Sequence, residues 1–355
     1  MASRDPRREL PLALTMGDAC GIGPEIVARF FRGGEAARCF VVGDVDVMRR
    51  AAELTGGSLP VARIVAPSDA LTLPPGCLPV LQAAGLIPGL LDAPLGSIDA
   101  RAGAAAARCV EHAAAMALAA GGGEIAAIVT APIHKEALAA AGVPFPGHTE
   151  MLQSLAGRAS GGALPPVRMM LANEELRTVL VTIHASLRRA IDDVTFDAVL
   201  ETIRIADAAM RRFGIAAPRV AVAGLNPHAG EGGLFGREEI EIIAPAVRAA
   251  QAEGIAASGP FAPDTVFMRA RDAAGHTGEF DVVVAMTHDH GLIPVKYLGV
   301  EQGVNVTLGL PFVRTSPDHG TAFDIAGSGR ADAASFAAAV RMARRLSTLS
   351  ASSAR

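Results

Sequence analysis

The sequence of 355 residues contains no tryptophan and one tyrosine, and aromatic residues make up only 4% of it. Without large aromatic side chains, the core must be built from Ala, Val, Leu and Ile, which favours helices packed closely on sheets. Since 50% of the residues are hydrophobic and 19% are charged, the composition excludes a disordered chain. The length predicts about two domains of ordinary size.

The chain also lacks a strong excess of charge and a long apolar run. Its net charge is −4, and it has no extended basic run with interleaved aromatic residues, so a nucleic-acid partner is not expected. An uninterrupted run of about 18 apolar residues, as a membrane span requires, is missing. The apolar stretch after the charged N-terminus breaks at Thr15 and Gly17, too early for a signal-peptide core. We therefore expect a cytoplasmic protein.

Three local signatures are missing as well. The four cysteines are far apart in the sequence, which excludes a zinc ribbon or a disulfide framework and predicts free thiols. Gly21-Ile22-Gly23 continues into Pro24 without the third glycine of a Rossmann fingerprint, and no Walker A sequence occurs. A nicotinamide cofactor would have to bind in another way.

The regular pattern that is present alternates apolar runs with helical segments. Strands are predicted at residues 12–15, 39–42, 125–130, 168–171, 178–182, 219–223 and 282–286. Helices are predicted from Pro24, over 45–54, 99–120, from Gly147, and over 196–213 and 237–253. This alternation predicts layered α/β domains with parallel or mixed sheets.

Three histidines follow within a few residues of the end of an apolar run, namely His184, His228 and His288. Neutral imidazoles from separate strands, with open coordination positions left, are typical of a catalytic divalent-metal site, with zinc as the first candidate. Any one of them could instead cap a loop. Their recurrence at three strand ends, with Asp289 and Glu231 nearby, favours the metal.

The remaining histidines and several cations are weaker candidates. His134, His148, His290 and His319 stay open, whereas His112 is expected to be structural and His276 solvated. The cations in glycine- and proline-rich context are Lys135, Arg237, Lys296 and Arg314, which suit a phosphate or carboxylate group. The helix that begins after Gly147 offers free N–H groups to the same kind of anion.

Eight segments of the chain together resemble one known family. They are TMGDACGIGPEI (15–26), VTAPIHKEAL (129–138), PGHTE (146–150), GLNPHAGEGGLFGREE (224–239), PDT (263–265), THDHG (287–291), GVNVTLGLPFVRTS (303–316) and DHGTAFDIAG (318–327). In this order, and over nearly the whole chain, they are similar to the 4-hydroxythreonine-4-phosphate dehydrogenase family.

The resemblance implies the fold of the isocitrate and isopropylmalate dehydrogenase class, with two layered α/β/α domains and the active site in the cleft between them. The first domain would comprise residues 1–145 with 305–355 and lie on the cofactor side. The second would comprise 146–304 and carry the metal, substrate and dimer side. A homodimer with active sites shared between its subunits is implied, with His184, His228 and His288 as the metal ligands.

The resemblance also implies a substrate site and a reaction. The substrate contacts would be His148, Thr149, Lys296, Asn305 and Arg314, the catalytic candidates Lys296 and Asp264, and the cofactor candidates Asp318 and His319. The implied reaction is the oxidation of the 3-hydroxyl of 4-phosphohydroxy-L-threonine, followed by decarboxylation, in pyridoxal phosphate biosynthesis. NAD or NADP would accept the hydride, and zinc, magnesium or cobalt would be the metal.

Two departures from the family pattern bear on the substrate. Thr287 and His290 stand where the biosynthetic enzymes usually have Tyr and Gln, and the proline of 292–296 is shifted by one place. D-threonate or D-erythronate 4-phosphate, or a cis-dihydrodiol of an aromatic acid, are the alternative substrates. A metal hydrolase with the same histidines and a phosphate-binding acyltransferase are alternatives of other classes, and a binding protein without catalysis fits least.

Overall fold

The computed structural model describes residues 10–83, 85, 87–120 and 123–350. The chain divides into two compact units. Unit 1 is Met1–Pro166 with Leu310–Arg355, and unit 2 is Val167–Gly309. The sequence boundaries were set at 145/146 and 304/305. Residues 148–159 fall in unit 1 because helix α5 (His148–Ala159) packs on α3 (Ala100–Leu118), and residues 304–308 pair with a strand of unit 2.

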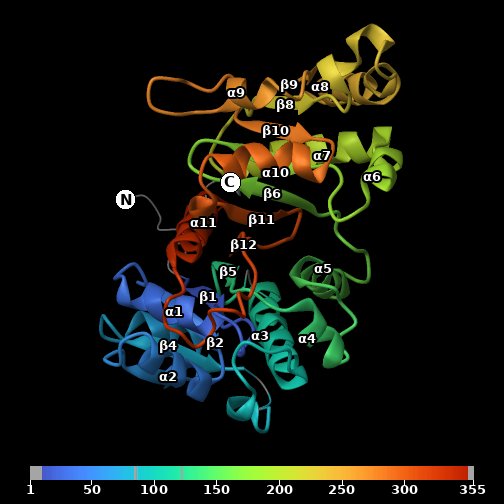
Figure 1. The fold of residues 1–355 in the computed structure, drawn as a ribbon. Helices are drawn as coiled ribbons and strands as arrows, with labels where there is room; N and C mark the ends of the chain where they lie inside the picture. Colours follow the sequence, from blue (N-terminus) through green and yellow to red (C-terminus); the bar gives the residue numbers. More distant parts are fainter. Residues whose placement is uncertain (1–9, 84, 86, 121–122, 351–355) are drawn as a thin grey trace, which may run out of the picture. The chain divides into compact units, whose positions relative to one another are not determined.

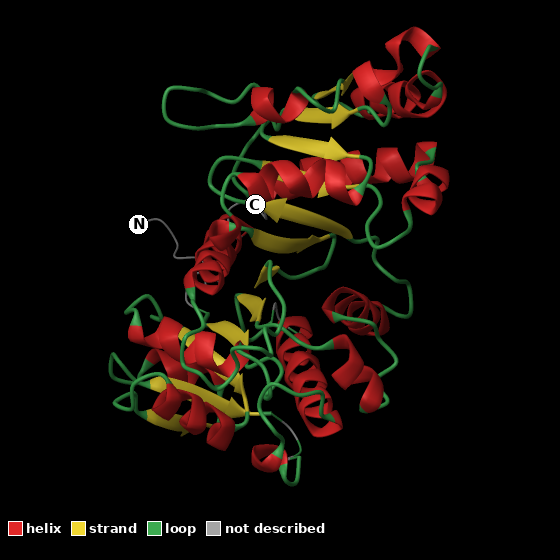
Figure 2. Cartoon of the chain, viewed as in Figure 1, coloured by secondary structure: helices red, strands yellow, loops and turns green. Residues whose placement is uncertain are grey.

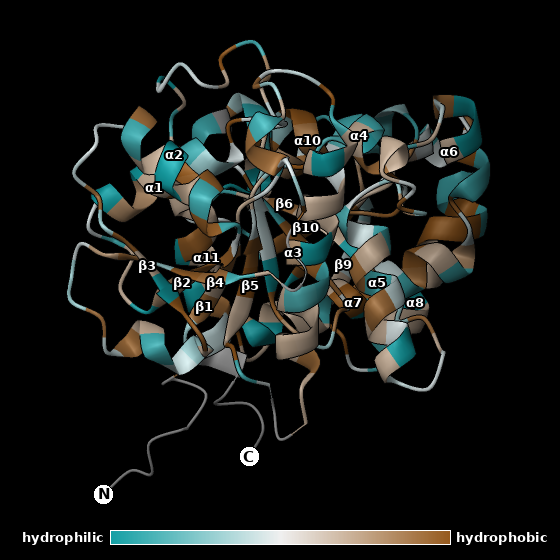
Figure 3. Ribbon diagram, turned by 90° about the horizontal axis from the view of Figure 1, so that it is seen from below, coloured by the Kyte–Doolittle hydropathy of each residue, from teal (hydrophilic) through white to brown (hydrophobic). Residues whose placement is uncertain are grey.

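Unit 1 is built on a parallel sheet with the strand order β3-β4-β2-β1-β5-β12. The strands are β3 (Val61–Ile64), β4 (Leu78–Gln82), β2 (Cys39–Gly43), β1 (Leu12–Thr15), β5 (Ala127–Thr130) and β12 (Arg314–Pro317). Every residue of β1, β2 and β5 is buried, so both faces of the sheet are covered. In Figure 3 these strands are drawn mainly in the brown of apolar residues.

The helices of unit 1 are α1 (Gly23–Arg32), α2 (Val45–Leu54), α3, α4 (Lys135–Ala140), α5 and α11 (Ala334–Ser350). Two of them, α2 and α3, begin at aspartates whose side chains cap them. Pro24 lies in the first turn of α1, and the carboxylate of Asp44 accepts hydrogen bonds from the first turn of α2. α3 contacts α4 so closely that a Cβ on Gly103 would lie 2.0 Å from the carbonyl oxygen of Ala137. Figure 2 shows these helices in red around the strands of the unit.

Unit 2 is built on a mixed sheet with the strand order β11-β6-β7-β10-β8-β9. The strands are β11 (Val304–Leu308), β6 (Arg168–Ala172), β7 (Arg177–Leu180), β10 (Val282–Ala285), β8 (Val220–Ala223) and β9 (Ala257–Phe261). β6 is antiparallel to both of its neighbours, whereas β7, β10, β8 and β9 are parallel (Figure 1). The carboxyl ends of these four strands therefore meet at one edge of the sheet.

The helices and short turns of unit 2 cover this sheet. They are α6 (Leu187–Asp193), α7 (Phe196–Arg212), the turn η4 (Pro227–Gly233), the π-helical turn η5 (Glu239–Ile243), α8 (Ala244–Ala252), α9 (Val266–Ala270) and α10 (His288–Tyr297). One buried cluster joins Val283 and Ala285 of β10 to Leu292 and Val295 of α10 and to Val266 of α9. This packing fixes α10 directly at the end of β10.

The predicted layered α/β fold class is confirmed, and most predicted elements end within two residues of the observed ones. Five strands were missed, namely β3, β4, β9, β11 and β12. The single helix expected over 237–253 is in fact the π-helical turn η5 followed by α8. All four cysteines are free thiols, as predicted. None of the helices in the part of the chain that the structure describes has the length and apolar character of a membrane span.

Candidate active site

Two of the predicted metal ligands lie close together in unit 2. His184 follows β7, and His288 follows the neighbouring strand β10 as the first residue of α10. Their ring centroids are 5.8 Å apart, and Nδ1 of His288 lies 2.7 Å from Oδ1 of Asp289. Two imidazoles bound to one zinc ion at about 2.0–2.1 Å have their ring centres roughly 5–6 Å apart, so this pair fits a shared ion.

The third predicted ligand, His228, does not form a three-ligand cluster with this pair. It lies on η4 after β8, the other neighbour of β10, and its ring centroid is 6.2 Å from that of Phe235. Among the residues that the structure describes, no three His, Cys, Asp or Glu side chains are gathered closely enough to hold a metal. The chain thus brings together two of the three predicted ligands, His184 and His288.

Unit 1 contains a buried guanidinium group. Arg314 is the first residue of β12 and is only 3% exposed. Its Nη2 and Nε donate to Oγ1 of Thr130, at the end of the neighbouring strand β5, over 2.6 and 3.2 Å. Burial lowers the pKa of Arg314 to about 10, although the carboxylate of Glu150 opposes this shift. Arg314 is therefore a positive charge that is largely removed from water.

His148 belongs to the same part of unit 1. It begins α5, and Thr149 and Glu150 follow it in the first turn, where the backbone N–H groups have no partner within the helix. Burial and the positive charge of Arg314 lower the pKa of His148 well below its ordinary value. The structure therefore brings His148 near Arg314, and His148 is a neutral imidazole at pH 7.

The other predicted substrate and catalytic residues lie in unit 2. Lys296 is an exposed residue in the last turn of α10, and Asn305 is half-buried in β11 opposite Leu171 of β6. Asp264 is exposed and directly precedes the N-cap residue of α9. His290, in the first turn of α10, has a pKa that burial lowers, and its Nδ1 atom is buried without a hydrogen-bond partner.

Two of the candidate cations are ordinary surface residues. Arg237 is exposed and forms an ion pair with Glu241, one turn further along the chain, at 2.5 Å. Lys135 is exposed at the start of α4. Neither has the burial that distinguishes Arg314.

Four further polar residues of unit 1 follow the strands β1, β5 and β12. Asp318 is half-buried after β12, and His319 is exposed with Nδ1 3.1 Å from the carbonyl oxygen of Gly320. Asp18, which was not predicted as a site residue, and His134, which was an open candidate, follow the adjacent strands β1 and β5. His134 stacks on Phe323, with centroids 4.7 Å apart and ring planes at 12°.

Asp18 is fully buried, and only one of its carboxylate oxygens is satisfied. Oδ1 accepts a hydrogen bond from the N–H of Cys20 at 2.8 Å, whereas Oδ2 is buried without a partner. Burial raises the pKa of Asp18. Gly17 permits the sharp turn before it, because φ is +75° and a Cβ there would lie 2.5 Å from the carbonyl oxygen of Pro132. The signals for Asp18 in the sequence were a Gly-Asp pair directly after a strand and its place in the family segment 15–26.

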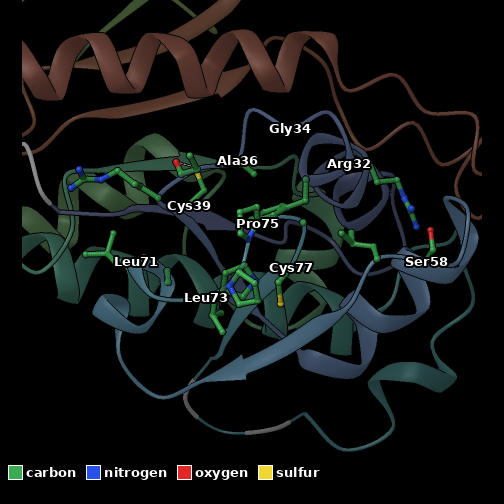
Figure 4. A pocket seen from close by; sticks show the side chains of 17 residues that line it. Arg32, Gly34, Ala36, Cys39, Ser58, Leu71, Leu73, Pro75 and Cys77 are labelled. Atoms are coloured by element: carbon green, nitrogen blue, oxygen red, sulfur yellow. Dashed lines mark hydrogen bonds between the residues drawn. The ribbon is translucent and has the colours of Figure 1, made fainter.

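A separate cavity of about 540 Å³ lies in unit 1 beside the first residues of β2 and β4. Figure 4 shows Arg32 and Ser58 at one end of it and Cys39 and Leu71 at the other. Since it lies where strands begin, it is at the opposite edge of the sheet from Asp18 and His134. No residue proposed for catalysis or binding lines it.

Comparison with known proteins decides the family. A family model described as pyridoxal phosphate biosynthetic protein PdxA matches residues 35–343. The chain belongs to this family. A relative from Beijerinckia indica named 4-hydroxythreonine-4-phosphate dehydrogenase is 54% identical over 337 residues, which cover 95% of each chain. A relative from Pectobacterium atrosepticum named D-threonate 4-phosphate dehydrogenase is 44% identical over 94% of this chain and 98% of its own.

A solved structure agrees with this assignment to the PdxA family. The crystal structure of 4-hydroxythreonine-4-phosphate dehydrogenase from Klebsiella pneumoniae is similar to this chain with a TM-score of 0.84 and 42% identity. It covers 95% of this chain and 99% of its own. The PdxA-family assignment thus rests on sequence and on fold, over almost the whole length of both proteins.

Proposed function

We propose that this protein oxidises the 3-hydroxyl group of 4-phosphohydroxy-L-threonine with NAD and then decarboxylates the product, as a step of pyridoxal phosphate biosynthesis. The 54% identity to a relative named for this activity, over 95% of the chain, carries the proposal. The buried charge of Arg314 supports it on physical grounds, because a phosphate group would compensate that charge.

We assign the substrate contacts to the residues that the family resemblance implies. In unit 1, a phosphate group would be bound by Arg314, whose guanidinium group is held by Thr130. His148 and the first turn of α5, which includes Thr149, would donate further hydrogen bonds to it. In unit 2, Lys296 and Asn305 suit the remaining polar groups. A neutral His148 donates a hydrogen bond to the phosphate without adding a second positive charge beside Arg314.

The proposed metal ligands are His184, His228 and His288, contributed by both subunits of a homodimer. The 5.8 Å separation of the His184 and His288 rings fits a shared ion, and imidazole donors favour zinc or cobalt over magnesium. When bound, the ion supplies Lewis-acid polarisation of the reacting oxygen. His184 and His288 hold this part of the site at the rigid edge of the unit 2 sheet.

The remaining chemistry concerns hydride and proton transfer. Bound NAD supplies the hydride acceptor for carbon 3, with Asp318 and His319 proposed on the cofactor side. The hydroxyl proton is released as the keto group forms, the bond to the carboxylate then breaks, and carbon dioxide leaves. We assign to Lys296 the delivery of a proton to the carbon that has lost carbon dioxide, with Asp264 as a supporting residue.

A second candidate is the oxidation of D-threonate 4-phosphate or D-erythronate 4-phosphate. The 44% identical relative named D-threonate 4-phosphate dehydrogenase favours it, as do Thr287 and His290 beside the proposed ligand His288. Both candidates share the phosphate group and therefore the same use of Arg314. A cis-dihydrodiol of an aromatic acid carries no phosphate, so its carboxylate would have to compensate the positive charge of Arg314.

The test compares NADH formation from 4-phosphohydroxy-L-threonine, D-threonate 4-phosphate, D-erythronate 4-phosphate and an aromatic-acid cis-dihydrodiol. The highest kcat/KM is expected with the first. NADH from a threonate or erythronate phosphate alone would transfer the assignment to the second candidate, and NADH from the dihydrodiol alone would overturn the phosphate site. Arg314→Lys should impair every phosphorylated substrate, whereas the control Arg341→Lys changes an exposed residue paired with Glu35.

A further inference from the structure

The loop that carries His228 has an unusual backbone. Five consecutive residues, His228 to Gly232, have positive φ angles between 43° and 81°. Three of them, His228, Ala229 and Glu231, are not glycine. L-residues disfavour this left-handed region, and several in a row persist only where the surrounding structure enforces it. The cause of this conformation must therefore lie outside the loop itself.

The buried carboxylate of Glu239 binds the segment that leads into this loop. Glu239 lies in the π-helical turn η5 and is only 3% exposed. Its Oε1 atom accepts hydrogen bonds from the backbone N–H groups of Leu225 and Asn226, both at 2.7 Å, and its Oε2 atom accepts one from Nδ2 of Asn226 at 3.0 Å. Nδ2 of Asn226 also donates to Glu238 at 2.7 Å. The residues directly before His228 are thus tied to η5.

The glycines of this segment leave room for the carboxylate. A Cβ on Gly230 would lie 2.7 Å from Oε2 of Glu239, and one on Gly224 would lie 3.1 Å from Oε1. A Cβ on Gly236 would lie 2.3 Å from Nδ2 of Asn226. Gly224 and Gly230 therefore both lie against the carboxylate of Glu239, and larger residues at these two positions would displace it.

Burial alone would raise the pKa of Glu239, but its hydrogen bonds to Asn226 and to the backbone of Leu225 outweigh burial and hold the pKa below its ordinary value. The group is thus a carboxylate at neutral pH. Hydrogen bonds to a charged acceptor are stronger than those between neutral groups, which suits a group that must hold a disfavoured backbone.

We propose that Glu239 is a positioning residue that presents the imidazole of His228 for metal binding by fixing the left-handed loop between β8 and η5. The inference rests on the proposed role of His228 as a ligand. Glu239 itself does not touch the metal or the substrate. Its effect is to keep His228 in the left-handed backbone conformation, which the loop alone would not maintain.

The test measures binding of Co²⁺ to the purified full-length protein by calorimetry and by the visible spectrum of the bound ion, without substrate. Glu239→Ala should weaken Co²⁺ binding by about 10- to 100-fold, as expected when a group that orients a ligand is removed. Its Co²⁺ spectrum should also change, because His228 no longer binds in the same way. Glu241→Gln, an exposed glutamate two residues away, is the matched control and should bind as the wild type does.

Two outcomes separate this inference from the proposed function. If the wild type binds no Co²⁺, the proposed metal site itself is wrong. If the wild type binds Co²⁺ and Glu239→Ala binds it equally tightly with the same spectrum, the positioning role is overturned. Should Glu239→Ala not fold, Glu239→Gln keeps the acceptor for Leu225 and Asn226 but loses the charge. A weaker Co²⁺ affinity at an unchanged melting temperature is then the expected result, and an unchanged affinity contradicts the role.

Discussion

The guanidinium group of Arg314 donates hydrogen bonds from both Nη2 and Nε to the single hydroxyl oxygen of Thr130, at 2.6 and 3.2 Å. The two residues are 184 positions apart in the sequence and meet because β12 pairs with β5. Both are buried, with Thr130 fully inaccessible and Arg314 3% exposed. Thr130 therefore holds the edge of the Arg314 guanidinium group that carries Nε and Nη2.

Replacing this hydroxyl should impair substrate binding. Thr130→Val keeps the shape of the side chain but leaves two N–H groups of a buried cation without their acceptor, and hydrogen bonds to charged groups contribute about 1.5–3 kcal/mol. Since about 1.4 kcal/mol corresponds to a factor of ten, we expect KM for the phosphorylated substrate to rise roughly tenfold or more. Steady-state NADH formation measures this change.

The chain offers a matched control for this substitution. Oγ1 of Thr202 likewise accepts a hydrogen bond from Nε of an arginine, Arg168, at 2.7 Å in unit 2. Thr202→Val should lower the melting temperature without changing KM. Equal KM values for Thr130→Val and the wild type would show that Thr130 does not position Arg314.

His148 should make stability depend on pH in a defined window. Its folded-state pKa lies well below the ordinary value because of burial and the charge of Arg314, whereas in the unfolded chain it is about 6.5. As the pH falls below about 6.5, the unfolded chain takes up a proton that the folded one does not, so stability is lost on acidification. The melting temperature of the wild type should therefore fall more between pH 7.5 and 5.5 than that of His148→Gln. Parallel curves for the two proteins would contradict this reading.

Asp18 should have the opposite effect on stability. Burial raises its folded-state pKa, so the ionised carboxylate destabilises the folded state at pH values above that pKa. Asp18→Asn keeps the acceptor for the N–H of Cys20 and removes the charge. We expect a higher melting temperature at pH 7.5, with the gain disappearing as the pH falls towards about 4, where the unfolded carboxyl also binds its proton. The exposed Asp324→Asn serves as the control, and an equal gain there would argue against a burial effect.

Loss of the proposed metal should abolish activity, whether the metal is removed by chelation or by substitution of His184 or His288. His184→Ala and His288→Ala should each reduce Co²⁺ binding by about 100-fold or more, because each removes a direct ligand. Chelation of the wild type should stop NADH formation, and added zinc or cobalt should restore it. His276→Ala changes an exposed histidine whose Nε2 atom lies 3.0 Å from the carbonyl oxygen of Met268, and it should leave binding intact. Undiminished activity of chelated wild type, or of His288→Ala, would remove the metal from the mechanism.

Much of the fold could be predicted because its signals are local. β1 and α2 occur with the predicted bounds, since a short apolar run and an Asp N-cap define them without distant partners. β12 was missed because its sequence, Arg-Thr-Ser-Pro, has no apolar character. It is a buried strand only because β5 pairs with it and α11 packs on it. Tertiary context overrides propensity at such positions.

The candidate site divides in the same way. The sequence by itself determined the strand-end positions of His184, His228 and His288, because alternating strands and helices place polar residues at the carboxyl edge of a sheet. It also contained the motifs that assign the chain to the PdxA family.

Only the tertiary structure decided which of these residues meet and in what state. It brought His184 to His288 and left His228 on a left-handed loop closed by Glu239. It also buried Arg314 against Thr130 and made His148 neutral. The physical reason is that burial, hydrogen-bond partners and pKa depend on groups brought together from distant parts of the chain, and no local pattern encodes such encounters.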